Sequence, residues 1–121
     1  MTQERNRANA KAELADAAKR RIETNYAEPF SLEAIANELF VNRHYLDRVF
    51  KQATGDTLLH YHNYVRCQAA KALLLRPEHS IAFIGRQVGY ISASHFAHVF
   101  KNFCGCTPSA YRNHCGNHSE V

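Results

Sequence analysis

The sequence predicts an all-α fold of about seven helices, with two helix-turn-helix subdomains joined by a long linker helix. The main observation is an internal repeat, in which residues 32–39 recur 49 positions later as residues 81–88. Residues 46–51 recur 50 positions later as residues 96–101, so one extra residue lies in the second turn. Apolar residues follow helical spacing, and no strand-like alternation is present. Each half is therefore expected to be a homeodomain-like three-helix unit.

The repeat also predicts how the chain is organised. We expect an N-terminal helix and the first helix-turn-helix subdomain in residues 1–56, and the linker helix in residues 57–77. The second subdomain is expected in residues 78–113. Residues 114–121 are polar and are expected to form a disordered tail.

The first predicted helix covers about residues 8–26, because apolar side chains recur there at helical spacing. Pro29 follows it and prevents its continuation. Ser31 is a good N-cap for a short second helix over residues 32–39.

The helix after the first turn has the position of a recognition helix. Asn42 is a good N-cap for it, and it is expected to cover residues 43–53 and to end at Gly55. The linker helix then covers about residues 58–76, where Pro77 closes it.

The second half repeats this order. Ser80 is expected to cap a short helix over residues 81–88, and Ser92 to cap a second recognition-type helix over residues 93–103. Thr107-Pro108 begins a short last helix, since proline is favoured at the first helical position.

Two pairs of equivalent residues bear on the helix packing and on the turn in each unit. Ala36 and Gly85 occupy the same repeat position, and a small side chain there lets a second helix approach closely. Gly89 allows a tight turn in the second unit. The first unit has Phe40 at the equivalent position, so its turn is expected to need a different backbone conformation. The predicted core residues are Leu32, Ile35, Leu46, Val49, Phe50, Ile81, Ile84, Val88, Phe96, Phe100 and Phe103.

Composition limits the class of protein. The chain has 121 residues, 45% of them hydrophobic, and a net charge of +4. No apolar run is long enough to span a bilayer, and the N-terminus has no signal-peptide core. The four cysteines do not form a disulfide framework, so a reducing cytoplasm is the expected location.

Charge and duplication together favour nucleic acid as the partner. Residues 66–112 contain six basic residues and one acidic residue, Glu78, a bias that suits phosphate contact, although solvated helix faces would show it too. A chain that builds one helix-turn-helix twice is most simply explained as contacting DNA in two places. The linker helix, at about 1.5 Å per residue, is a rod of roughly 30 Å, close to the roughly 34 Å turn of B-DNA.

Several segments resemble the AraC/XylS family of bacterial transcription regulators. The stretch from Ser31 to Ala36 and the stretch from Tyr45 to Lys51 resemble its first motif. The second motif and its ending are resembled by Ile81 to Tyr90, His95 to Lys101, and Gly105 to Arg112. Residues similar to the family's linker helix are Tyr61, Arg66, Ala70 and Leu74.

This resemblance implies a transcription regulator, expected to be an activator, that binds an asymmetric promoter site. No cofactor, metal or enzymatic activity is implied. RNA polymerase is an expected partner, and this domain alone is expected to be monomeric. Many members carry an effector or dimerisation domain ahead of this one; the 121 residues leave no room for it, so it is missing upstream if Met1 is not the native start. The positions that match the family's base contacts are His44, Asp47, Arg48, Ala93, Ser94, His95 and His98.

The first unit is expected to supply most of the base specificity. Arg48 can donate two hydrogen bonds to a guanine edge, or it can contact phosphate. Asp47 can accept from a cytosine amino group or orient Arg48. The second helix has shorter side chains, so we expect it to dock mainly through the DNA backbone. The phosphate-contact candidates are Ser31, Lys51, Arg66, Ser80, Lys101 and Arg112, whose alternative roles are helix capping and solvated charge.

Two other classes of function stay open at this point. Thiolates and imidazoles are the ligands that zinc prefers, and a metal- or thiol-sensing module would use Cys104, Cys106, His114, Cys115 and His118. Their spacing is not that of a standard zinc finger. A protein-interaction module would use the exposed surface of the second unit, including Arg86 and Gln87. An enzyme is disfavoured because no nucleophile lies beside a base in the sequence.

Overall fold

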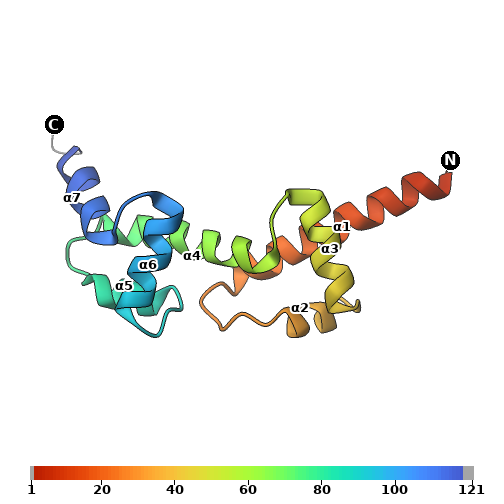
Figure 1. Ribbon diagram of the computed structural model, residues 1–121, viewed down its shortest axis with the longest axis horizontal. Coiled ribbons are helices and arrows are strands. Elements are labelled where there is room, and N and C mark those ends of the chain that lie inside the picture. Colours follow the sequence, from red (N-terminus) through yellow and green to blue (C-terminus); the bar gives the residue numbers. More distant parts are fainter. Residues whose placement is uncertain (1, 119–121) are drawn as a thin grey trace. The chain divides into compact units, whose positions relative to one another are not determined.

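The computed structural model describes residues 2–118 (Figure 1). Side chains are described from residue 6 to residue 114. This described part of the chain contains helices and no strand, which confirms the predicted all-α class. The helices are α1 (Thr2–Thr24), α2 (Leu32–Glu38), α3 (Arg43–Thr54), α4 (Leu58–Leu74), α5 (Ile81–Gln87), α6 (Ala93–Cys104) and α7 (Pro108–His118).

The chain forms two compact units. The first comprises the segment up to Asn25 together with Phe30–His62, and the second comprises Tyr26–Pro29 together with the segment from Asn63 onward. The linker helix α4 is therefore shared between the units rather than forming a part of its own. The short segment Tyr26–Pro29, which lies between α1 and α2 in sequence, belongs to the second unit.

All four predicted N-caps are confirmed. Asn42 Oδ1 accepts from the backbone N–H groups of the first turn of α3, and the hydroxyls of Ser31, Ser80 and Ser92 each accept from the N–H three residues on. At the other end of α3 and α6, Gly55 and Gly105 take the left-handed conformation with φ values of 87° and 81°. These local bonds explain why both recognition-type helices have twelve residues.

In the first unit, α1 and α2 pack against α3. Its core holds the predicted Ile35, Leu46 and Phe50, together with Ile22 of α1 and Leu58 of α4, each at most 2% exposed. The ring centroid of Phe50 lies 5.7 Å from that of Tyr61. Burial of large aromatic side chains such as Phe50 is a main source of stability in a small unit.

The core of the second unit repeats this arrangement. Ile84, Val88, Phe96 and Phe100 are fully buried as predicted. The ring centroids of Phe100 and Tyr111 are again 5.7 Å apart, and this pair lies 50 positions after Phe50 and Tyr61. The repeat therefore extends into α4 and α7. Cys67, Ala70, Leu74 and Tyr90 complete this buried cluster.

The turns differ in their residues but share a left-handed backbone. Gly89 has a φ of 110°, and Phe40 at the same repeat position has a φ of 60°. The first unit thus makes the same kind of turn with a phenylalanine. A methyl group added to Gly85 would lie 2.8 Å from Cδ2 of Phe96, which confirms that a small residue is needed between α5 and α6.

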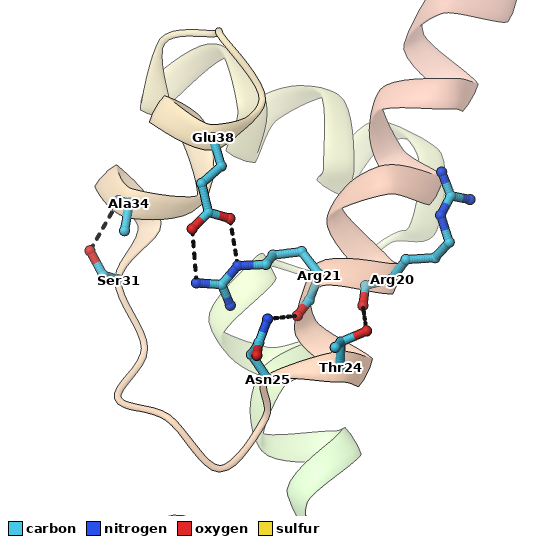
Figure 2. A network of polar contacts seen from close by, with 7 residues as sticks. All are labelled: Arg20, Arg21, Thr24, Asn25, Ser31, Ala34 and Glu38. Carbon is cyan, nitrogen blue, oxygen red and sulfur yellow. Dashed lines mark hydrogen bonds and ion pairs between the residues drawn. The ribbon is translucent and has the colours of Figure 1, made fainter.

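A polar network joins α1 to α2 in the first unit (Figure 2). The Arg21 guanidinium donates from Nε to Glu38 Oε2 at 2.6 Å and from Nη2 to Oε1 at 3.3 Å. This hydrogen bond from Arg21 lowers the pKa of the Glu38 carboxyl below its usual value. Thr24 Oγ1 and Asn25 Nδ2 donate to carbonyl oxygens of the last turn of α1, which satisfies acceptors at that helix end.

The ends of the chain differ from the prediction. Helix α1 begins at Thr2, earlier than the predicted residue 8, because its first turns are polar and give no apolar periodicity although their residues favour helix. Helix α7 continues to His118, so the tail expected to be disordered from residue 114 is helical at residues 114–118. The remainder of that tail lies outside the described residues.

Candidate nucleic-acid interface

Helix α3 has one buried face and one exposed face. Leu46, Val49 and Phe50 are buried, whereas His44 and Arg48 are exposed one turn apart. The Arg48 guanidinium carbon lies 5.5 Å from the centroid of the Tyr45 ring, a distance at which a cation and an aromatic ring attract each other. The structure thus leaves both predicted contact side chains open to a ligand.

Asp47 has a contact within the unit that the sequence did not predict. Its side chain is half-buried, and Oδ1 accepts a hydrogen bond from the Leu58 N–H at 3.2 Å. That N–H belongs to the first turn of α4, so the carboxylate caps this helix and favours its positive end. This bond gives the Asp47 carboxylate a partner within the unit, and its contact with a base stays a prediction.

Helix α6 exposes shorter side chains. Ala93, Ser94, His95 and His98 are all exposed, whereas Phe96 and Phe100 are buried. His95 meets the Tyr90 ring edge-on with centroids 5.3 Å apart. The exposed face of α6 carries no arginine among the predicted contact positions, and the unequal division of base specificity between the helices stays a prediction.

Sequence analysis missed a second exposed position on each helix. Gln52 and Asn102 are both exposed and lie four residues after Arg48 and His98, respectively. The amide of Asn102 lies 3.4 Å from Nε2 of His98. The same 50-residue offset that aligned the repeats would have found this pair. Side-chain amides can bind adenine through two hydrogen bonds, so both residues belong to the candidate interface.

Arg66 does not contact phosphate as predicted, because it is buried. Only 7% of the residue is exposed. Nε donates to the Tyr26 carbonyl at 2.6 Å and Nη2 to the Glu28 carbonyl at 2.7 Å. The guanidinium carbon also lies 4.9 Å from the centroid of the Tyr90 ring. Burial lowers the pKa of Arg66, and its hydrogen bonds hold the segment Tyr26–Pro29 in place.

Arg112 does the same for the loop that precedes α5. Nε donates to the Leu74 carbonyl at 2.8 Å, and Nη2 donates to the carbonyls of Arg76 and His79 at 3.1 Å and 2.6 Å. These are the last carbonyl of α4, which the helix itself leaves without a donor, and two loop carbonyls. These bonds give Arg112 a role within the unit, and its phosphate contact stays a prediction.

Four phosphate candidates stay exposed. Lys51 and Lys101 lie in the last turns of α3 and α6 at equivalent repeat positions. Ser31 and Ser80 lie at the starts of α2 and α5, where their hydroxyls accept from Ala34 and Phe83. Capping explains the serines, and interaction with the negative helix end explains the lysines, so their phosphate contact stays a prediction.

The cysteines do not form a metal site among the described side chains. Within that part of the chain, no three His, Cys, Asp or Glu side chains are grouped so that they could hold a metal ion. Cys67 is buried, and burial raises its thiol pKa to about 12. Cys104 is half-buried against the second core, where burial raises its pKa too. The side chains of Cys115 and His118 lie outside the described residues.

No helix within the described residues is long and apolar enough to cross a membrane.

Comparisons with known proteins agree with two helix-turn-helix units. A family model described as a helix-turn-helix domain matches residues 35–114. The chain is 35% identical over 92 residues to the HTH-type transcriptional regulator ArgR of Pseudomonas aeruginosa, covering 76% of this chain and 28% of that protein. It spans less than half the length of the first curated relatives it matches.

Two solved structures are similar to this fold. The C-terminal domain of AraT, a response regulator from Geobacillus stearothermophilus, matches with a TM-score of 0.79 and 32% identity, covering 83% of this chain and 84% of that one. The DNA-binding domain of AdpA, solved in complex with a target DNA, matches with a TM-score of 0.70 and 26% identity, covering 85% and 89%.

Proposed function

The chain belongs to the AraC-type family of helix-turn-helix transcription regulators, and we propose that it binds double-stranded promoter DNA in a sequence-specific way through α3 and α6. The observation that carries this proposal is the duplication of one amphipathic helix. In each unit, a capped twelve-residue helix buries its apolar face and exposes polar side chains at the same repeat positions. A helix of this kind fits the major groove.

Helix α3 supplies most of the base specificity in this proposal. Arg48 is exposed and long enough to donate two hydrogen bonds to a guanine edge. His44 lies one turn earlier on the same face. On α6, His95 and His98 reach less far, while Ser94 accepts or donates and Ala93 offers only a methyl group. Helix α6 docks mainly through contacts with the DNA backbone.

Phosphate contacts position both helices. Lys51 and Lys101 are the exposed basic residues at equivalent places, and Ser31 and Ser80 lie at helix starts whose backbone N–H groups attract anions. Contacts with RNA polymerase, a monomeric state of this domain and a cytoplasmic location belong to the same proposal. The role is binding and regulation of transcription rather than catalysis.

Selection from a randomised duplex library, followed by sequencing at near-physiological salt, tests this function. The proposal predicts an enriched asymmetric site. The variant Arg48→Ala should lose preference at one position of that site, because the guanine contact carries sequence information. Arg20→Ala is the matched control, since it removes the same charge from the exposed face of α1. The absence of any enriched sequence with the unmodified protein would contradict the proposal.

A further inference from the structure

Each unit exposes one large apolar side chain at the turn before its recognition helix. Phe40 is 93% exposed in the first turn, and Ile91 is 97% exposed in the second. Other exposed large apolar side chains in the described part of the chain, such as Leu59 and Leu75, retain about half of their contact with the protein, at 51% and 53% exposure. The two turn residues therefore contribute almost nothing to the packing of either unit.

Phe40 is also held in a backbone conformation that its residue type disfavours. Its φ is 60°, in the left-handed region, where a β-carbon is crowded against the backbone. The second unit has Gly89 at this position, and glycine makes the turn without that strain. Neither packing nor turn geometry explains the phenylalanine. Strain and exposure that the fold does not need are typical of a residue that serves binding.

Both side chains lie close to the part of each unit that is proposed to enter the major groove. Phe40 precedes the N-cap Asn42 by two residues, and Ile91 directly precedes the N-cap Ser92. Consecutive Cα atoms are about 3.8 Å apart, so the Cα atom of Phe40 lies within about 8 Å of that of the N-cap Asn42. The next side chains, Arg43 and His44, are exposed and basic, which suits a polyanion as the neighbour.

We infer that Phe40 and Ile91 contact apolar atoms of the DNA duplex, on the basis of the proposed function. The apolar groups that DNA offers beside a recognition helix are thymine methyl groups and the carbon atoms of deoxyribose, and phenylalanine contacts the methyl group favourably. Both turns then add sequence- or shape-dependent contact beyond the two helices. Contact with the duplex also buries the two side chains that the protein leaves almost fully in water.

The test measures the affinity of Phe40→Gly and Ile91→Ser for the duplex that the unmodified protein enriches. Each variant should bind roughly fivefold more weakly, as expected for the loss of a few buried carbon atoms. The slope of log K against log salt should not change, because no phosphate contact is lost. Asparagine tolerates the left-handed backbone, so Phe40→Asn removes the ring without the backbone flexibility that glycine adds. Leu75→Ala is the matched control and should bind as the unmodified protein does.

Duplexes with deoxyuridine in place of single thymidines identify the contacted atoms. A position where the unmodified protein loses affinity and Phe40→Gly does not assigns the contact to a thymine methyl group. If the variant binds more weakly but no such position is found, the contact is assigned to the carbon atoms of deoxyribose. Unmodified affinity in both turn variants would overturn the inference, even if a transcription reporter lost activation, since that would assign the side chains to a protein partner. Failure of the unmodified protein to select any duplex would instead overturn the proposed function.

Discussion

Replacing Gly89 with alanine is expected to destabilise the second unit much more than replacing Gly105. Both glycines have a left-handed backbone, with φ values of 110° and 81°. A methyl group at Gly89 would lie 2.7 Å from the Arg66 guanidinium carbon and 2.8 Å from the Ala27 carbonyl oxygen. At Gly105 it would meet nothing within 4 Å. Comparing the two variants separates the cost of left-handed backbone strain from the cost of displacing neighbouring atoms.

The expected magnitudes follow from these contacts. Both substitutions cost about 1–2 kcal/mol of left-handed strain. At Gly89 the guanidinium must also move away from the carbonyls of Tyr26 and Glu28, to which it donates at 2.6 Å and 2.7 Å. Losing one hydrogen bond from a charged group adds about 1.5–3 kcal/mol. Gly89→Ala should therefore cost about 2.5–5 kcal/mol in total.

Urea unfolding followed by circular dichroism measures both free energies of unfolding. The double variant Gly89→Ala/Arg66→Ala gives a further check. If the alanine acts by displacing Arg66, its cost should fall once the guanidinium is absent, so the two changes should not be additive. Equal losses for Gly89→Ala and Gly105→Ala, together with additivity in the double variant, would refute this reasoning.

Four further substitutions test the assigned roles. Arg48→Ala should relax sequence preference at one base pair by about 1–3 kcal/mol, whereas His98→Ala should weaken all duplexes alike; a loss at one base pair in the His98 variant would contradict this division. Asp47→Ala should cost about 1 kcal/mol of stability in urea, because the Leu58 N–H loses its acceptor; unchanged stability with altered base preference would restore its role as a base contact. Burial raises the pKa of the Cys67 thiol from 9.0 to about 12, so the folded state holds this proton more tightly than the unfolded chain. Stability should be complete below about pH 9 and fall as the pH rises toward about 12, and Cys67→Ala should flatten that fall in unfolding measurements.

The sequence predicts most of the helices because their ends are set by local chemistry. Serine and asparagine caps, left-handed glycines and proline act within a few residues of themselves, and the structure confirms the caps at Ser31, Asn42, Ser80 and Ser92. The repeat also identified the buried face of each recognition helix. A pattern of period 3.6 needs no tertiary contact to be recognised.

The hydrogen-bond partners of polar side chains could not be predicted in the same way. Arg66 and Arg112 looked like phosphate contacts because their charge is visible in the sequence, while the carbonyls that they bind lie 33 to 40 positions away. Asp47 caps a helix eleven positions later. Contacts over such separations depend on how loops pack, which composition and periodicity do not encode. The polar ends of α1 and α7 were missed for a related reason, since a helix without an apolar stripe leaves no periodic signal.

The central claim is that the exposed faces of α3 and α6 recognise a DNA sequence. The most direct measurement is the affinity of the chain for its enriched duplex and for a shuffled duplex of the same composition, over a range of salt concentrations. The account predicts that affinity for both falls steeply with salt, and that the enriched duplex binds at least about a thousandfold more tightly near physiological salt. Equal affinity for the two duplexes, or binding that does not depend on salt, would contradict it.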